Sequence, residues 1–267
     1  MYKGIRGIRY YIEIIGEGEP LLLLHGFTGS SSDWKETVPF LGDYKLILVD
    51  LIGHGNTEIP YDQSRFSMEE VCCDLTVLLE GLNVEKVNIA GYSMGGRTAL
   101  SFAMYNPGRV KKLILESASP GIKNSRDRDS RAESDRILAK SILEDGVRAF
   151  VDKWENTPLF FSQKSLGSVK QEAIRRQRLS HTAEGLAGSL TGMGTGVQPN
   201  WWPHLKKCKI PVLILTGEWD EKFCEIGKEM HHLLEHSEHI EIQRTGHAIH
   251  VEQPRIFGTI VDGFLKQ

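Results

Sequence analysis

The chain has 267 residues, of which 40% are apolar and 25% charged, and its formal net charge is -3. This composition is typical of a globular protein and excludes a chain that stays disordered. The small negative charge gives no sign of a basic surface for nucleic acid. No apolar run approaches the roughly 18 residues needed to cross a bilayer, so we expect no membrane insertion.

The N-terminal residues and the cysteines bear on the cellular location. Lys3, Arg6 and Arg9 interrupt every apolar run near the N-terminus, unlike the layout of a secretory signal, and this predicts a cytoplasmic protein. The cysteines include an adjacent pair but no C-x-x-C motif, which argues against a disulfide framework or a zinc site. We expect four reduced core thiols, at Cys72, Cys73, Cys208 and Cys224.

Short apolar runs recur along the chain and indicate buried strands. Residues 5–15 are strand-like, and the later runs fall at 21–24, 46–49, 87–90, 113–115, 212–215 and 240–242. They are continuous rather than alternating, as in a parallel sheet covered on both faces. Helices are predicted between several of them, one opened by a capping box at 67–70 and one over 94–105. The sequence therefore predicts an α/β fold with a mostly parallel central sheet and helices on both faces.

The alternation of strands and helices stops between residues 122 and 203, where the sequence is polar and helical. We therefore predict a core formed by residues 1–121 and 204–267, with a helical lid insertion over 122–203. Residues 122–200 carry three more basic than acidic side chains. This excess fits either a lid that attracts anions or ordinary solvated helix faces.

A nucleophile motif lies between a predicted strand and a predicted helix. Gly91-Tyr-Ser-Met-Gly95 matches G-x-S-x-G and joins the strand at 87–90 to the helix at 94–105. A serine in a strained turn needs neighbours without side-chain bulk, which the two glycines provide. The pattern indicates a reactive serine at Ser93, although a simple connecting turn has the same composition.

A serine hydroxyl becomes reactive when a histidine accepts its proton and an acid orients that histidine. Asp220 follows the predicted strand that ends at 215, and His247 follows the one that ends at 242. The order Ser93, Asp220, His247 is the one found in α/β-hydrolases.

Other residues could take the histidine and acid positions. His250 is a rival for His247, and the rivals for Asp220 are Glu116, Glu218 and Glu221. We favour His247 because a Gly-His turn directly after a strand projects the ring over the carboxyl edge of the sheet. The eight remaining histidines are expected mainly on the surface, since no metal-ligand spacing such as H-E-x-x-H occurs. We predict neither a metal site nor a cofactor.

His25-Gly-Phe27 follows the predicted strand at 21–24, at the position from which this kind of fold contributes an oxyanion donor. The second donor is the amide of the residue after the nucleophile, so we predict the N–H groups of Phe27 and Met94 as the pair. His25 itself is expected to brace the turn. A tight turn without a catalytic role is the alternative.

These motifs together resemble the α/β-hydrolase superfamily over nearly the whole chain, from 25–27 through Asp50-Leu-Ile-Gly-His-Gly55 to 246–247. Serine at position 93 excludes the aspartate nucleophile of haloalkane dehalogenases and epoxide hydrolases. Further motifs are similar to the 2-succinyl-6-hydroxy-2,4-cyclohexadiene-1-carboxylate synthases of menaquinone biosynthesis. They lie at 91–97, 116–121, 126–136, 154–160 and 217–223.

The resemblance implies a lyase that eliminates pyruvate from 2-succinyl-5-enolpyruvyl-6-hydroxy-3-cyclohexene-1-carboxylate, with Ser93 acting as the base. It also implies substrate-binding residues, at Tyr92, Arg97, Arg131, Trp154, Phe160 and Arg178. Which of Arg175, Arg176 and Arg178 faces the pocket stays open. Arginines suit such a substrate because they bind carboxylates in a bidentate fork. A small polycarboxylate is thus the expected partner, and a monomer is favoured.

Two other functions fit the same residues. A carboxylesterase or carbon–carbon bond hydrolase would use Ser93 as a true nucleophile and form an acyl-enzyme. A ligand-binding protein could keep the triad and turn over negligibly, because one fold hosts many functions.

Overall fold

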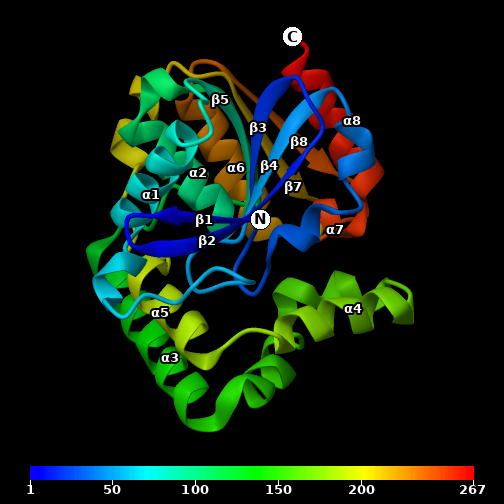
Figure 1. The fold of residues 1–267 in the computed structure, drawn as a ribbon. Helices are drawn as coiled ribbons and strands as arrows, with labels where there is room; N and C mark the ends of the chain where they lie inside the picture. Colours follow the sequence, from blue (N-terminus) through cyan, green and yellow to red (C-terminus); the bar gives the residue numbers. More distant parts are fainter.

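The computed structural model describes residues 1–267, and its centre is one eight-stranded sheet (Figure 1). The strand order is β1-β2-β4-β3-β5-β6-β7-β8. Strands β1, β2 and β4 pair antiparallel, and the pairs from β4 through β8 are parallel. The strands are β1 (Tyr2–Ile5), β2 (Ile8–Ile15), β3 (Glu19–Leu24), β4 (Tyr44–Val49), β5 (Val87–Tyr92), β6 (Val110–Glu116), β7 (Val212–Gly217) and β8 (Ser237–Ile242). The predicted α/β class with a mostly parallel sheet is confirmed.

The prediction of one strand over 5–15 is wrong. The chain turns at Arg6 and Gly7 and forms the hairpin β1–β2, in which Ile5 pairs with Ile8. Both turn residues have positive φ, 46° and 85°, as a two-residue hairpin turn with the right twist requires. Glycine adopts positive φ without strain, so Gly7 indicated a turn at this point of the sequence. The apolar residues on either side of it gave the appearance of one continuous strand.

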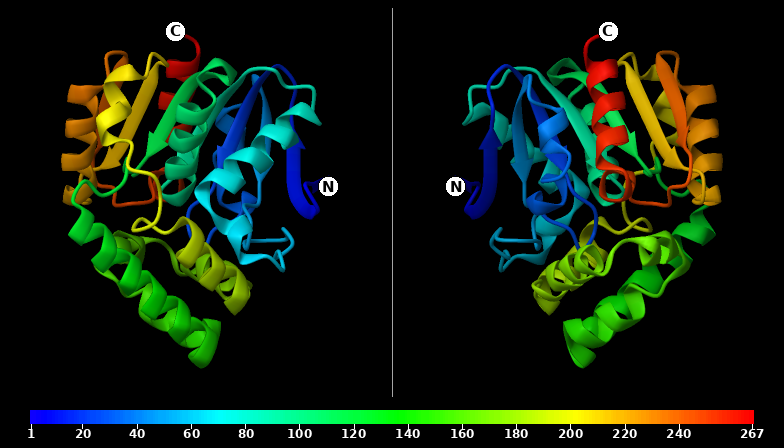
Figure 2. Two further views of the ribbon diagram at one scale, coloured as in Figure 1. Left: turned by 90° about the vertical axis from the view of Figure 1, so that its left-hand side faces the viewer. Right: turned by 90° about the vertical axis from the view of Figure 1, so that its right-hand side faces the viewer.

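Helices cover both faces of the sheet (Figure 2). Leu22 and Leu24 of β3 pack in the cluster with α1 and α2, whereas Leu21 and Leu23 pack in the cluster with α8. All four side chains are fully buried, which explains why the strand reads as a continuous apolar run. The α-helices outside the insertion are α1 (Met68–Glu80), α2 (Met94–Tyr105), α6 (Glu221–Leu233), α7 (Ile249–Glu252) and α8 (Pro254–Leu265).

The chain between β6 and β7 is helical and lies across one end of the sheet (Figures 1 and 2). It contains α3 (Ser125–Trp154), the 3-10 helix η5 (Pro158–Ser165), α4 (Ser168–Leu179) and α5 (Ala183–Met193). Helix α3 is kinked at Gly146, where φ is 84°. The segment has an apolar cluster of its own, formed by residues of α3 and α5. Its predicted limits, 122–203, and its role as a lid stay predictions.

Five shorter 3-10 helices complete the secondary structure. They are η1 (Ser31–Trp34), η2 (Val38–Phe40), η3 (Gln63–Phe66), η4 (Pro107–Arg109) and η6 (Trp202–Lys207). None of the helices combines the length and the apolar character of a membrane-spanning segment.

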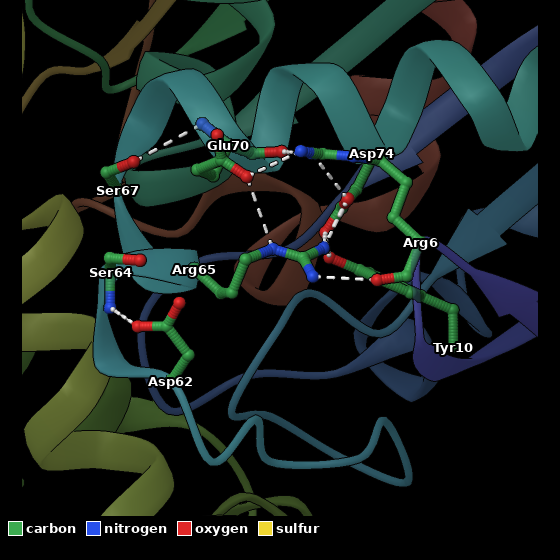
Figure 3. A network of polar contacts seen from close by, with 8 residues as sticks. All are labelled: Arg6, Tyr10, Asp62, Ser64, Arg65, Ser67, Glu70 and Asp74. Carbon is green, nitrogen blue, oxygen red and sulfur yellow. Dashed lines mark hydrogen bonds and ion pairs between the residues drawn. The ribbon is translucent and has the colours of Figure 1, made fainter.

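A polar network centred on Asp74 of α1 ties the N-terminal hairpin to the first helix (Figure 3). The Asp74 carboxylate has no exposed surface and accepts hydrogen bonds from Arg65 at 2.6 and 2.8 Å. Arg6 of the hairpin turn donates to it at 3.0 Å, and the Tyr10 hydroxyl donates at 2.8 Å. The buried charge is thus surrounded by donors from the hairpin and from η3.

The predicted burial of cysteines and histidines needs correction. Cys73 is exposed, whereas the other three cysteines are buried. It lies about 100° around α1 from its buried neighbour Cys72 and so faces solvent.

Two of the histidines expected mainly on the surface, His54 and His181, are buried. His25 is buried as well and braces the turn after β3 as expected, since its Nδ1 lies 2.8 Å from the Gly26 carbonyl oxygen and its Nε2 accepts the Leu51 amide at 2.9 Å. The three histidines come from three distant segments and pack against one another, a contact that no local pattern reveals.

Candidate active site

Ser93 sits at a sharp turn between β5 and α2, with φ 50° and ψ -106°. Its amide donates to the carbonyl of Glu116 on the neighbouring strand at 2.8 Å. A Cβ atom on Gly91 would lie 2.3 Å from the carbonyl oxygen of Gly95, and one on Gly95 would lie 2.1 Å from that of Leu24. Both positions therefore exclude a side chain, which accounts for the G-x-S-x-G pattern.

The three residues predicted as a triad come together. His247 Nε2 lies 3.0 Å from Ser93 Oγ, and His247 Nδ1 lies 2.5 Å from Asp220 Oδ2. The Asp220 carboxylate can only accept, so it favours the tautomer with the proton on Nδ1 and leaves Nε2 to accept from the serine. The imidazole is 2% exposed and packs against the Phe223 ring at 4.7 Å. This is the geometry of a hydroxyl activated by a general base.

The rival residues are engaged elsewhere. His250 Nδ1 lies 2.9 Å from Glu116 Oε1, both side chains are buried, and the His250 ring packs against Trp34. Glu218 accepts the Arg244 amide at 2.8 Å. Glu221, in the first turn of α6, is exposed. None of these side chains contacts Ser93 or His247 in place of the favoured residues.

A cavity of ≈ 230 Å³, here called the inner cavity, opens beside Ser93 and His247. Helices α2, α3, α5 and α6, the 3-10 helix η5, the end of β5 and the loops after β3 and β6 supply its walls. Nine predicted site residues line it: Phe27, Tyr92, Ser93, Met94, Arg97, Arg131, Trp154, Phe160 and His247. Asp220 lies behind His247.

The two predicted oxyanion donors are both in this wall. The Phe27 amide, in the loop after β3, makes no hydrogen bond within the chain. Met94 is the first residue of α2, so its amide has no helical carbonyl to bond. Gly26 leaves room for the Tyr92 ring, since a Cβ atom there would lie 2.5 Å from Tyr92 Cε1. The arrangement presents two backbone donors next to Ser93, and their catalytic role remains a prediction.

The inner cavity holds more positive than negative charge. Arg97 donates to the Met193 carbonyl at 2.6 Å and to Gln198 at 2.5 Å, but it has no carboxylate partner. Arg131 bonds one carboxylate, that of Asp135, at 2.8 Å. Burial, and then the nearby charge of Arg131, lower the pKa of Arg97 to about 10. The two guanidinium groups thus make one carboxylate contact between them, which favours an anionic ligand.

Arg178 does not line the inner cavity, in contrast to the expectation from the resemblance. Its guanidinium stacks on the Phe160 ring at 4.5 Å and donates to Gln163 at 3.0 Å, facing two neighbouring cavities. It is buried, and burial lowers its pKa. Arg175 pairs with acidic residues of α3 and its C-terminal end, and Arg176 is exposed. Of the three, only Arg178 is thus buried without a carboxylate partner.

Sequence reasoning missed several residues of the inner cavity. Lys222 and Phe223 line it because α6 begins at the triad acid and its first turn faces the same space. Their closeness to Asp220 in the chain was the available signal. Ser189 and Leu190 reach the cavity from α5, and only the packing of the insertion brings them there.

Comparisons with known proteins agree with this geometry. Residues 19–254 match the family described as alpha/beta hydrolase fold. The putative 2-succinyl-6-hydroxy-2,4-cyclohexadiene-1-carboxylate synthase of Bacillus subtilis (strain 168) is 47% identical over 97% of this chain and 95% of its own length. The synthase of the same name from Yersinia pestis (strain Pestoides F) is 28% identical over 94% and 88%. The structure of MenH from S. aureus superposes with a TM-score of 0.92 at 39% identity, covering 96% of this chain and 98% of that one.

Proposed function

This chain belongs to the α/β-hydrolase family, and we propose that within this family it is a lyase of menaquinone biosynthesis. It eliminates pyruvate from 2-succinyl-5-enolpyruvyl-6-hydroxy-3-cyclohexene-1-carboxylate and yields 2-succinyl-6-hydroxy-2,4-cyclohexadiene-1-carboxylate. The activity in the names of its relatives supports this assignment. The observation that carries it is the pair of guanidinium groups in the wall of the cavity that contains Ser93: Arg97 and Arg131 make only one carboxylate contact between them.

The reaction begins with removal of a proton from the ring carbon that bears the succinyl carbonyl. Ser93 Oγ takes this proton while His247 Nε2, 3.0 Å away, accepts the hydroxyl proton. Negative charge then develops on the succinyl oxygen, where the amides of Phe27 and Met94 stabilise it. The electron pair moves through the ring double bond and expels the enolpyruvyl oxygen from ring carbon 5. The product is a conjugated diene, and the leaving group becomes pyruvate after protonation at carbon.

The substrate suits the charges of the inner cavity. It carries three carboxylates, and guanidinium groups bind carboxylates through two parallel hydrogen bonds without losing their charge. Tyr92, Trp154 and Phe160 supply apolar surface for the ring. An elimination exchanges no electrons with an external carrier, so the proposal includes no cofactor. A cytoplasmic location and a monomeric state are part of the same proposal.

A carboxylesterase is the second candidate, because the same triad can attack an ester. An esterase differs from the proposed lyase in the first turnover on a nitrophenyl ester. Formation of the acyl-enzyme releases a burst of nitrophenol before steady state. A ligand-binding protein would show neither a burst nor turnover above background.

The test is to generate the pathway intermediate in the assay and to follow pyruvate and the diene chromophore together. We expect both to form at one rate with the wild-type protein, and Ser93→Ala to abolish both. An ordinary esterase of the same fold serves as control and should release no pyruvate. Pyruvate formation no faster than the uncatalysed reaction would disprove the proposed function.

A further inference from the structure

A second cavity of ≈ 660 Å³, here called the outer cavity, adjoins the triad. It shares three residues with the inner cavity, Leu159, Lys222 and His247. Its other walls are Pro158, Phe161, Ser162, Ser165, Trp219, Asp220 and Gly246. His247 and Lys222 therefore border both spaces.

The charge of Lys222 has no partner in the chain. Its ammonium forms no ion pair and no hydrogen bond. It lies over the Phe223 ring, with Nζ 5.7 Å from the ring centroid. Lys228, on the same helix, is instead paired with Glu225 at 3.0 Å and with Glu241 at 3.2 Å. The adjacent acid in the chain, Glu221, is exposed and forms no ion pair with Lys222, and Asp220 is bonded to His247. Lys222 is thus free to bind an anion that enters either cavity.

The two cavities differ in their cations. Arg97 and Arg131 line only the inner cavity, whereas Lys222 is the one lysine or arginine in the wall of the outer cavity. Two exposed aromatic residues, Phe161 and Trp219, complete that wall with 53% and 55% of their surface accessible. An open space with one cation suits a small monocarboxylate.

The proposed substrate divides in the same way. The ring that is retained carries two carboxylates, one on the ring and one on the succinyl group, and the group that leaves carries the third. The bond that breaks must lie beside Ser93 in the inner cavity and near His247, which also borders the outer cavity. If the two retained carboxylates face Arg97 and Arg131, the carboxylate of the leaving group lies on the side of Lys222.

We propose that Lys222 binds the carboxylate of the enolpyruvyl group, and that the outer cavity holds this group before and after the carbon–oxygen bond breaks. The inference rests on the proposed function. Lys222 keeps its proton throughout: the enol oxygen leaves ring carbon 5 with the electron pair and becomes the ketone oxygen of pyruvate. An ammonium on a flexible stem suits this role, because the group it binds has to depart.

The experiment compares Lys222→Gln with the matched control Lys228→Gln from the same helix. Lys222 is exposed and lacks a partner, so its replacement should leave the melting temperature unchanged. We expect Lys222→Gln to lower kcat/KM for the pathway intermediate by about 10-fold or more, as loss of a charged hydrogen bond does. Turnover of a neutral nitrophenyl ester, which has no carboxylate to bind, should fall far less, and Lys228→Gln should match the wild type on both. Equal kcat/KM values for the two variants on the intermediate would overturn the inference.

Direct binding of pyruvate separates this inference from the proposed function. In an NMR titration, we expect the wild type to bind pyruvate and Lys222→Gln to lose about 10-fold in affinity. Affinity for succinate, which resembles the retained side chain, should be the same in both proteins. A wild type that binds pyruvate but does not release it from the intermediate would disprove the proposed function alone. Equal pyruvate affinity in wild type and variant, or no measurable binding to the wild type, would overturn the role of Lys222.

Discussion

His181 Nε2 lies 3.0 Å from the carbonyl oxygen of Thr28, so the junction between α4 and α5 is bonded directly to the loop after β3. The other ring nitrogen, Nδ1, accepts the Gly55 amide at 3.4 Å. Nε2 can donate to Thr28 while Nδ1 accepts from Gly55 only when the ring is neutral and carries its proton on Nε2. Thr28 follows Phe27, a predicted oxyanion donor, and has φ 65°. The helical insertion therefore helps to hold that donor in place.

Replacement of His181 by glutamine or by asparagine separates the two hydrogen bonds. The glutamine amide nitrogen can take the place of Nε2 and donate to Thr28, whereas the asparagine oxygen can take the place of Nδ1 and accept from Gly55. We expect His181→Asn to lower kcat about 10-fold with little change in KM, because misplacement of an oxyanion donor acts on the transition state. His181→Gln should keep most of the activity.

Steady-state kinetics on the pathway intermediate and on a neutral ester check this expectation, with melting temperatures measured alongside. A role in folding alone would lower the melting temperature of both variants and leave their kcat values equal. That result would contradict a positioning role for the bond to Thr28.

Stability should fall as the pH is lowered from about 6.5 towards 4. Burial lowers the pKa of His181 to about 4, although the hydrogen bond to Thr28 opposes the shift. Burial also places the pKa of His54 well below 6.5. Between these values the unfolded chain binds protons that the folded chain does not, so acid favours unfolding. For His181 alone the loss reaches about 3 kcal/mol at the acid end.

Urea unfolding at several pH values between 7.5 and 4 measures this dependence. His181→Gln removes one of the titrating groups, so its unfolding free energy should change less steeply with pH than that of the wild type. Parallel curves for the two proteins would show that His181 does not contribute.

The meeting of Ser93, Asp220 and His247 was predictable because each residue lies in the turn or loop that follows a strand of the parallel sheet. The carboxyl ends of parallel strands lie along one edge, so position in the chain translates into position in space. The strands themselves were evident, since runs such as 21–24 are apolar on both faces.

Other features depend on packing between segments that are remote in the sequence. The location of Arg178 depends on how α4 stacks over Phe160, and the histidine cluster joins residues from positions 25, 54 and 181. Helix α4 has a polar sequence with a single buried residue, so no apolar pattern indicated how it would dock. The charges of the insertion likewise gave no guide to which arginine is enclosed.

Arg131→Ala should weaken turnover of the carboxylated substrate far more than that of a neutral aryl ester. Loss of one charged, bidentate contact is expected to lower kcat/KM by about 10- to 100-fold on the first substrate. The ester has no carboxylate for Arg131 to bind and should be affected little. Arg136→Ala, which removes an exposed arginine of the same helix, is the control. Equal losses on both substrates would count against a role for Arg131 in carboxylate binding.

Asp220→Asn should leave the fold intact and lower kcat by about 10³- to 10⁴-fold, because an amide does not hold the histidine tautomer that accepts from Ser93. His247→Ala should be at least as inactive. The double variant Ser93→Ala/His247→Ala should be no slower than either single variant, since the residues act as a unit. Single-turnover measurements of pyruvate release test this, and additive losses would argue against a shared step.

Asp74→Ala should destabilise the protein without altering catalysis, because its network ties α1 to the N-terminal hairpin and not to the site (Figure 3). Removal of the carboxylate leaves the side chain of Arg65, which is 16% exposed, without its closest partner. Breaking such a buried pair costs about 3 kcal/mol of unfolding free energy. Glu70→Ala disrupts a partly exposed pair with the same arginines and should cost at most about 1 kcal/mol. Urea unfolding of the two variants measures the difference, and similar losses for both would show that the burial of Asp74 does not strengthen its pairing.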